Sequence, residues 1–352
     1  MDNRNDVTRR RFIGGTTASL GTTAFAAGGL GLPRSARAAP EVSRLVMTQA
    51  VTSLAFIQNY IAAELGYFAD EGLDVEIVVT RGGGPDVQAV LAGDAAFTIN
   101  DGAQILPAVA KGLPLTCLMA TLDRNIINVS MLKDTAEQLS VGPESPIEDK
   151  LAALAGLNIG ITRPGSLTWQ LARFNLNTAG LDPETGATIV GLGGGPAVAA
   201  GLQNGDVDAI YISVPLGERV VHSGQAITLI DNANGEDPNL PNFMMEGLWA
   251  KPDFVAENPN TCRAVIRALS RASEFVLDEN VGDVSAALTS TFGALGEEVL
   301  AIGVNKVKAA VSRSRVFDQT MLDHTQKVLL LNKALETPFE IDSLFDPRFL
   351  EG

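Results

Sequence analysis

Aromatic side chains and cysteines are scarce in this sequence. Phe, Trp and Tyr together make up 5% of its 352 residues, and so little stacking surface argues against a sugar or an extended aromatic molecule as the ligand. The two cysteines, Cys117 and Cys262, stand in a strand pattern and in a helix pattern. Two buried thiols are therefore favoured over a disulfide.

Motifs for enzymatic or metal chemistry are missing as well. The two histidines, His222 and His324, belong to unrelated helix patterns, and there is no His-Glu-x-x-His, no cysteine pair at metal spacing and no Gly-x-Ser-x-Gly. The Gly-Gly-Gly run at 82–84 lacks the Gly-Lys-Ser/Thr ending of a phosphate-binding loop. The sequence therefore predicts a protein that is not an enzyme and that holds no metal and no cofactor.

No run of about 18 apolar residues occurs, so we expect no membrane-spanning helix. Residues 8–13 read TRRRFI, a Gly-, Ala- and Thr-rich run extends to Leu32, and residues 36–38 read ARA. A basic region, a weakly apolar region and an A-x-A site in this order resemble a twin-arginine export signal. We expect a signal peptide over residues 1–38, cleavage after Ala38 and a soluble product in the periplasm.

Acidic side chains outnumber basic ones, above all once the signal peptide is removed. Of the 26 Lys and Arg and the 41 Asp and Glu, six Arg and two Asp lie in residues 1–38, which leaves 20 basic and 39 acidic side chains and a net charge of −19. Such a surface repels nucleic acid and anionic lipid. An anionic ligand is still allowed, because helix N-termini act locally while surface charge is screened beyond about 10 Å.

One stretch of the sequence occurs twice. Residues 82–99 read GGGPDVQAVLAGDAAFTI and residues 193–212 read GGGPAVAAGLQNGDVDAIYI. In each copy a strand pattern leads into a Gly-rich loop, a short helix that ends at Gly-Asp, and a further strand. We interpret the copies as equivalent β-loop-α units of two similar lobes, with a ligand cleft at the carboxyl ends of parallel strands.

Residues 66–75, GYFADEGLDV, resemble the helix-end signature of periplasmic solute-binding proteins of the nitrate/sulfonate/taurine class. This family also includes binders of thiamine-pyrimidine precursors. The helix end LAGD at 91–94 and the segment IGITRPGS at 159–166 fit the same resemblance. It covers most of the chain that remains after residue 38.

The resemblance implies an α/β fold of the type II periplasmic-binding-protein kind, with two lobes joined by crossovers near 121–125 and 241–247. Lobe one would comprise residues 39–122 and 246–352, and lobe two residues 123–245. Each lobe would be a parallel-rich sheet flanked by helices, with the extra C-terminal helices covering lobe one. The implied function is the solute-binding component of an ABC importer, a monomer whose partners are a small molecule and a membrane permease.

The expected ligand-binding residues lie in loops that follow parallel strands. Lobe one contributes Thr52, Ser53, Phe56, Gly83, Gly84, Asn100, Asp101 and Thr121. Lobe two contributes Arg163, Gly165, Ser166, Thr168, Gly194, Gly195 and Ser213.

Four of these positions have two interpretations. Ser166 caps the start of a helix and is favoured as a donor to an anion there. Arg163 is either a bidentate clamp for that anion or a side chain that faces solvent. Asp101 is either the cap of the helix over 103–111 or a partner for a ligand nitrogen. Phe56, like Trp169, fits a core position better than a cavity wall.

The favoured ligand is a small organic anion of the sulfonate, taurine or carboxylate type, and the alternative is a thiamine-type pyrimidine or another small heterocycle. An Asp101 that faces the cleft would disfavour a purely anionic ligand such as nitrate. An exported enzyme on the same scaffold is the rival from another class, although the Cys-rich motif of the family's catalytic branch is missing. A ligand sensor for a membrane kinase is a third alternative. Its sequence would have the same features as that of a transport receptor, so the sequence does not separate the two.

Overall fold

The computed structural model separates residues 1–38 from residues 39–352. It describes residues 38–80, 82–344, 346 and 348. The expected twin-arginine signal lies outside these residues, apart from Ala38. In the described part of the chain no helix has both the length and the apolar character needed to cross a membrane.

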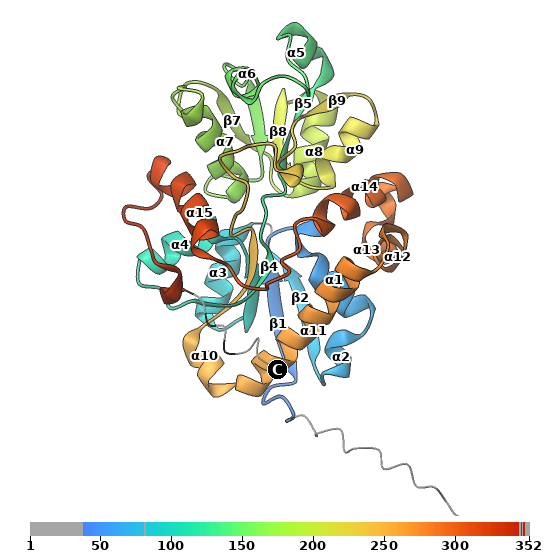
Figure 1. Cartoon of the computed structure of the whole chain (residues 1–352), viewed down its shortest axis with the longest axis vertical. Coiled ribbons are helices and arrows are strands. Elements are labelled where there is room, and N and C mark those ends of the chain that lie inside the picture. The colour runs from blue at the N-terminus through green and yellow to red at the C-terminus, as the bar shows by residue number, and fades with distance from the viewer. Residues whose placement is uncertain (1–37, 81, 345, 347, 349–352) are drawn as a thin grey trace, which may run out of the picture. The chain divides into compact units, whose positions relative to one another are not determined.

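The first lobe is built on a sheet with the strand order β2-β1-β3-β10-β4 (Figure 1). Its strands are β1 (Arg44–Gln49), β2 (Asp74–Val79), β3 (Phe97–Asn100), β4 (Thr116–Leu122) and β10 (Glu246–Ala250). The first three run parallel, whereas β10 is antiparallel to both of its neighbours. All residues of β3 and β10 are buried, as expected for central strands that helices cover on both faces.

Helices flank this sheet. They are η1 (Leu54–Phe56), α1 (Ile57–Glu64), α2 (Tyr67–Asp70), α3 (Gly83–Ala92), α4 (Gly102–Ala110), α10 (Pro252–Glu257) and α11 (Pro259–Asp278). The long α11 packs on α1 and α2, and the face that helical spacing predicts for it, through Val265, Leu269, Ala272 and Val276, is buried. The helices that follow are α12 (Val281–Ala287), α13 (Thr289–Phe292), η3 (Gly293–Leu295), α14 (Glu297–Lys308), α15 (Gln319–Leu331) and η4 (Ile341–Ser343).

The second lobe repeats the plan with the strand order β7-β6-β8-β5-β9. Its strands are β5 (Ile127–Leu132), β6 (Asn158–Ile161), β7 (Thr188–Gly191), β8 (Ala209–Ser213) and β9 (Ala226–Ile230). Its helices are α5 (Lys133–Gln138), α6 (Ile147–Ala152), α7 (Leu167–Thr178), α8 (Gly195–Asn204), α9 (Leu216–His222) and η2 (Asn232–Asn234). Strand β6 is parallel to β7 and β8, and β5 is antiparallel to β8 and β9.

The repeated stretch occupies equivalent places in the two sheets. The unit β2-α3-β3 flanks β1, and β7-α8-β8 flanks β6 in the same parallel arrangement. Both helices end at a glycine in the left-handed region, Gly93 with φ 87° and Gly205 with φ 76°. A side chain with a Cβ is disfavoured there, and this explains why a Gly-Asp pair ends each helix.

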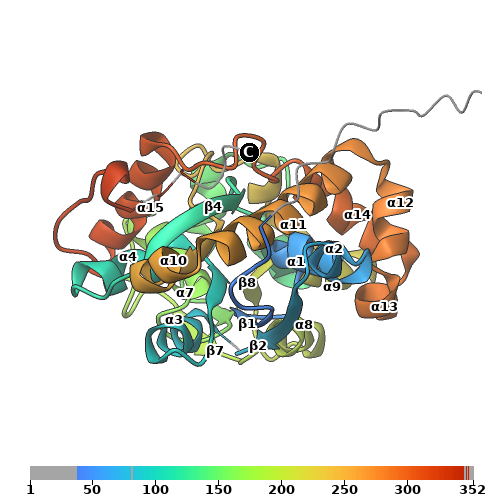
Figure 2. The same ribbon diagram turned by 90° about the horizontal axis from the view of Figure 1, so that it is seen from below.

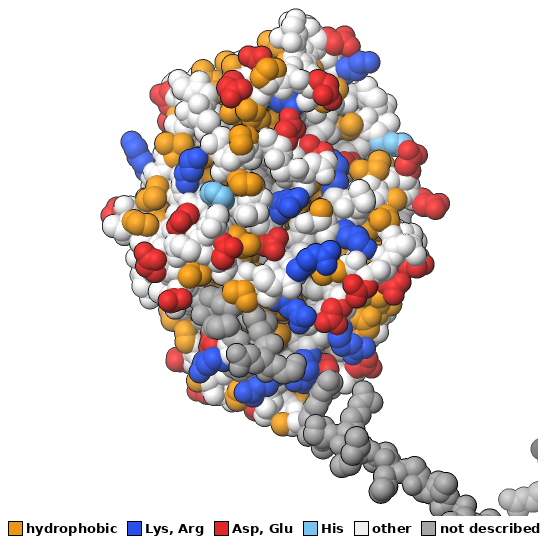
Figure 3. All heavy atoms as spheres, viewed as in Figure 1, with side chains coloured by type: hydrophobic (Ala, Val, Ile, Leu, Met, Phe, Trp, Pro, Cys, Tyr) orange, Lys and Arg blue, Asp and Glu red, His pale blue; other side chains and the backbone are white. Residues whose placement is uncertain are grey.

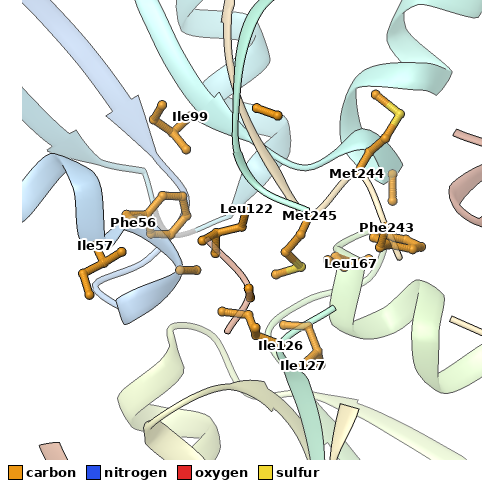
Figure 4. Close-up of a cluster of buried hydrophobic side chains, with 14 of the residues drawn as sticks. Phe56, Ile57, Ile99, Leu122, Ile126, Ile127, Leu167, Phe243, Met244 and Met245 are labelled. Carbon is orange, nitrogen blue, oxygen red and sulfur yellow. The ribbon is translucent and has the colours of Figure 1, made fainter. Parts of the chain in front are cut away.

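The chain passes between the sheets twice. It leaves the first after β4, which ends at Leu122, and returns from β9 to begin β10 at Glu246. The second sheet is thus inserted into the first, and the two-lobe α/β class expected from the sequence is confirmed. Apolar side chains from both lobes and both crossovers meet at the junction, among them Phe56, Leu122, Ile126, Leu167 and Met245 (Figure 4).

The last helices contact the second lobe in addition to the first. Helix α14 also packs on α9, and α15 on α7, and Figures 1 and 2 place the two helices on opposite sides of the junction. Lys306 Nζ of α14 lies 3.1 Å from Glu218 Oε1 and 2.9 Å from Asp231 Oδ2 in the second lobe. Asn332, at the end of α15, donates to the carbonyl of Gln170 at 2.7 Å. Both helices therefore hold the lobes together.

Candidate functional site

A small cavity lies at the junction, and both lobes and the second crossover contribute to its walls. The cavity volume is about 50 Å³, so a ligand held here is small. The cavity lies where β1, β3, β6 and β8 end, the edge at which open α/β sheets bind ligands. The lining residues are Ala50, Val51, Ala55, Phe56, Gly82, Asp101, Gln104, Ile127, Thr162, Ser166, Leu167, Thr168, Ile212, Ser213, Met245 and Glu246.

Asp101 both caps a helix and lines the cavity. Its Oδ1 accepts the backbone N–H of Gln104 at 2.9 Å, and this hydrogen bond caps α4. The carboxyl group is buried, and desolvation raises the pKa of Asp101 to about 7, partly offset by backbone hydrogen bonds from Gln104 and Ala103. The two interpretations of Asp101 that the sequence leaves open are therefore compatible.

Glu246 is the first residue of β10, and its carboxyl group is incompletely hydrogen-bonded. The residue is 4% exposed, and its Oε2 has no hydrogen-bond partner among the described residues. Burial, together with the negative charges of Asp101 and Asp86, raises the pKa of Glu246 well above its usual range. A buried carboxylate oxygen without a partner is costly, and in a cavity wall it marks a place where a ligand donor can bind.

Asp86, on α3, is the third acid of this group. Its side chain is fully buried, and Oδ1 accepts a hydrogen bond from the Thr80 hydroxyl at 2.6 Å. Desolvation raises the pKa of Asp86 to about 7; the Asp101 charge acts in the same direction, whereas the Arg163 charge opposes it. The three acids give this side of the junction a negative potential when they ionise.

Positive charge is sparse at the cavity itself. None of the lining residues, all of which belong to the described part of the chain, is Lys, Arg or His. Arg163 lies nearby and packs across the Gly-rich loop of the other lobe, where a Cβ added at Gly82 would be 2.2 Å from its Nε. Acidic and basic side chains are interspersed over the face in Figure 3, so the charges nearest the cavity dominate its potential.

Three neighbouring hydroxyl groups belong to the lobe-two wall. Thr162 directly follows β6, Ser166 caps α7 by accepting the Trp169 N–H at 3.3 Å, and Thr168 lies in the first turn of that helix. Their oxygen atoms are 2.8 to 2.9 Å from one another. This wall carries no full charge and offers hydroxyl hydrogens and free helix N–H groups.

Direct hydrogen bonds join the lobes beside the cavity. Ser53 Oγ lies 2.6 Å from Ser213 Oγ and 3.3 Å from the carbonyl oxygen of Val214. Gln104 Nε2 donates to the carbonyl of Gly165 at 2.6 Å. The lobes are therefore in direct contact here.

The predicted site residues fall into three groups. Phe56, Asp101, Ser166, Thr168 and Ser213 line the cavity. Ser53, Asn100, Thr121, Arg163 and Gly165 support its walls or the contact between the lobes: Asn100 Oδ1 accepts the Asp101 N–H, and Thr121 Oγ1 donates to the Glu246 carbonyl at 2.9 Å.

The remaining predictions do not reach the cavity. Thr52 lines a separate groove with Pro196 and Phe292. Gly194 and Gly195 are not in the cavity wall, and Gly195 instead gives room to Leu216, which an added Cβ would approach to 2.3 Å. Gly84 also lies outside the wall, to which its loop contributes Gly82; the prediction for Gly83 falls on a residue whose surroundings are not described. Trp169, weighed as an aromatic wall, packs beneath the Arg173 guanidinium instead.

Sequence reasoning missed Glu246, Gln104 and Thr162, together with most of the apolar wall. Glu246 did carry a signal, because it is the one charged residue in the apolar run FMMEGLWA at 243–250. Ile127, Ile212, Leu167 and Met245 carry none, since each fits an ordinary core position in its own strand or helix.

Two α/β lobes, crossed twice by the chain and enclosing a small cavity at their strand ends, define the architecture of periplasmic binding proteins. Residues 53–280 match the family described as NMT1/THI5 like, and the chain belongs to this family.

Three known proteins illustrate the similarity. The formylaminopyrimidine-binding protein of Halalkalibacterium halodurans is 25% identical over 234 residues, which are 66% of this chain and 65% of that protein. The alkanesulfonate-binding protein SsuA from Xanthomonas axonopodis pv. citri, solved with MOPS, has a TM-score of 0.69 at 15% identity, over 87% of this chain and 99% of SsuA. The periplasmic nitrate-binding protein NrtA from Synechocystis PCC 6803 has a TM-score of 0.65 at 15% identity, over 89% of this chain and 88% of NrtA. At these identities the two structures establish the fold.

Proposed function

We propose that this protein is the periplasmic solute-binding component of an ABC importer and that its ligand is a small nitrogen-bearing organic molecule. The observation that carries the proposal is the buried Glu246 Oε2, which lacks a partner among the described residues and belongs to the cavity wall. An N–H donor on the ligand would supply the missing hydrogen bond, and hydrogen bonds to charged groups contribute more than neutral ones.

The charges near the cavity favour such a ligand over an organic anion. Asp101 and Glu246 both line it, and a negative charge about 4 Å from one ionised carboxylate meets a repulsion of about 4 kcal/mol at an effective dielectric constant of 20. Arg163 is directed to the Gly-rich loop. Because the pKa of Asp101 is about 7, this repulsion acts fully above neutral pH, where a sulfonate or nitrate ion is disfavoured and a nitrogen donor is not.

The apolar walls narrow the ligand further. Phe56, Ile127, Leu167, Ile212 and Met245 surround the two carboxyl groups, and a flat ring buries well against such side chains. An aminopyrimidine combines a ring of this size with an exocyclic N–H donor. The 25% identical relative named as a formylaminopyrimidine-binding protein supports this choice.

Ligand capture would work by closure of two hinged lobes. The strand orders support residues 39–122 and 246–352 as lobe one and residues 123–245 as lobe two. A ligand that contacts both lobes only in the closed arrangement shifts the population toward it. The closed form would then dock on a membrane permease, and the expected twin-arginine signal would direct the chain to the periplasm.

A thermal-shift screen tests the ligand class. The purified protein is heated with 4-aminopyrimidine, pyrimidine, taurine, ethanesulfonate or nitrate. A ligand at 100 times its dissociation constant adds about 2.7 kcal/mol to the free energy of unfolding, which raises Tm by several degrees. We expect 4-aminopyrimidine to raise Tm more than pyrimidine, which lacks the amino donor. A shift with ethanesulfonate or nitrate and none with 4-aminopyrimidine would contradict the proposal.

A further inference from the structure

The hydroxyl groups of the lobe-two wall differ in how fully their hydrogen bonds are used. Ser166 Oγ donates to the carbonyl of Arg163 at 2.7 Å. It also accepts from the Trp169 N–H at 3.3 Å and from the Thr162 hydroxyl at 2.9 Å. One donor and two lone pairs are the whole capacity of a hydroxyl. Ser166 therefore has neither a hydrogen nor a lone pair left for a ligand.

Thr162 is committed as well, because its hydrogen goes to Ser166. Thr168 Oγ1 accepts the Thr162 N–H at 3.1 Å, and its own hydrogen has three choices. It can point to Thr162 Oγ1 at 2.9 Å or to Ser166 Oγ at 2.8 Å, or it can rotate toward the cavity that Thr168 lines. Of the three hydroxyls, Thr168 is the one whose hydrogen has no single assigned acceptor, so it can turn to a ligand at the cost of one hydrogen bond within the cluster.

The opposite wall points to a ligand at the same place. Glu246 is 4% exposed and its Oε2 lacks a partner among the described residues, whereas Thr168 is 5% exposed and belongs to the other lobe. One wall thus needs a donor and the other offers one. Thr168 also lies in the first turn of α7, where the N–H groups have no partners within the helix.

We propose that the Thr168 hydroxyl determines specificity by donating to an acceptor atom of the ligand, on the side opposite the nitrogen that donates to Glu246. This inference rests on the proposed function and deepens it. The ligand class is then a small molecule with a donor at one edge and an acceptor at the other, as in an amino-substituted nitrogen heterocycle. Because the two contacts come from different lobes, such a molecule favours the closed arrangement.

Two probe molecules test the role of the acceptor atom of the ligand. Both 4-aminopyrimidine and aniline carry an amino group on a six-membered aromatic ring, but aniline lacks the ring nitrogens. Calorimetric titration of the wild-type protein should show tighter binding of 4-aminopyrimidine. Thr168→Val removes the hydroxyl and keeps the shape, so we expect about tenfold weaker binding of 4-aminopyrimidine and unchanged binding of aniline.

Two further variants separate specificity from structure. Thr168→Ser keeps the hydroxyl and should retain the preference for 4-aminopyrimidine. Thr178→Val is the matched control, because Thr178 lies at the far end of the same helix and donates to the Phe174 carbonyl; it should leave the ratio of the two affinities unchanged. Binding of 4-aminopyrimidine that Thr168→Val leaves intact would overturn the inference alone. A wild-type protein that binds neither probe would overturn the proposed function with it.

Discussion

The side chain of Arg163 in the second lobe lies directly against the backbone of Gly82 in the first. A Cβ added at Gly82 would be 2.2 Å from Arg163 Nε and 2.6 Å from its Cζ, which is closer than any real contact allows. Gly82 also has φ 145°, a conformation that other residues rarely adopt. A side chain at residue 82 would therefore displace Arg163 from this contact between the lobes.

Replacement of Gly82 by Ala should hinder closure and weaken ligand binding. Backbone strain at Gly82 acts whether or not Arg163 is present, whereas the clash needs the Arg163 side chain. A double-mutant cycle of Gly82→Ala and Arg163→Ala, followed by calorimetric titration, separates the two effects. We expect Gly82→Ala to cost at least about 1 kcal/mol more of binding free energy in the wild-type background than in the Arg163→Ala background. Equal costs in both backgrounds would show that the contact does not limit closure.

Asp101 should make both stability and binding depend on pH. Its pKa in the folded protein, about 7, is above the 3.8 of an unperturbed aspartate, so its contribution to stability is present below about 3.8 and is lost as pH rises through about 7. Asp101→Asn keeps a helix cap but cannot ionise. We expect the Tm of the variant relative to wild type to rise between about pH 4 and about pH 8.

The same ionisation should strengthen the binding of a neutral nitrogen donor. Asp86 and Glu246, whose pKa values are also raised, act in the same direction. Affinity for 4-aminopyrimidine should therefore increase from pH 6 to pH 8, and the increase should be smaller in Asp101→Asn. Titrations at the two pH values measure this. An affinity that falls with rising pH would instead indicate an anionic ligand.

Lys306 should contribute strongly to stability, because it joins α14 to the second lobe through Glu218 and Asp231. The side chains of Lys306 and Glu218 are 13% and 6% exposed. Removal of one partner from a buried ion pair typically costs about 3–5 kcal/mol, since the other charge stays buried. Lys306→Met should therefore lower the free energy of unfolding in urea by about 3 kcal/mol. Lys308→Met, in the last turn of the same helix, removes only a hydrogen bond to the Glu279 carbonyl; it is the control and should lower the free energy of unfolding by about 1 kcal/mol.

Local patterns of the sequence predicted two equivalent lobes, and the family resemblance predicted how they are connected. The Gly-Asp helix ends marked two β-α-β units, because spacing and turn chemistry depend on neighbouring residues and are visible in the chain. The resemblance, and not the local pattern, indicated crossovers near 121–125 and 241–247. The contacts of α14 and α15 with the second lobe were missed, because a helical pattern shows which face is apolar but not how many partners cover it.

The site was predictable where a loop follows a strand and caps a helix, as with Asp101 and Ser166. Gly194 and Gly195 belong to the same pattern, but α8 begins away from the cavity wall. Glu246 lies in the second crossover, and its closeness to Asp101 results from the insertion of one lobe into the other. Such a contact between residues far apart in the sequence has no local signal.

The most direct test of the account is the affinity of Glu246→Gln for two ligands of opposite character, measured by calorimetric titration at pH 8. The variant removes the carboxylate charge, and Glu298→Gln on the surface of α14, where the side chain is 76% exposed, serves as the control. The account predicts that 4-aminopyrimidine binds wild type and the control alike and binds Glu246→Gln at least about tenfold more weakly, while ethanesulfonate binds none of the three. Ethanesulfonate binding to wild type that tightens in Glu246→Gln would contradict it.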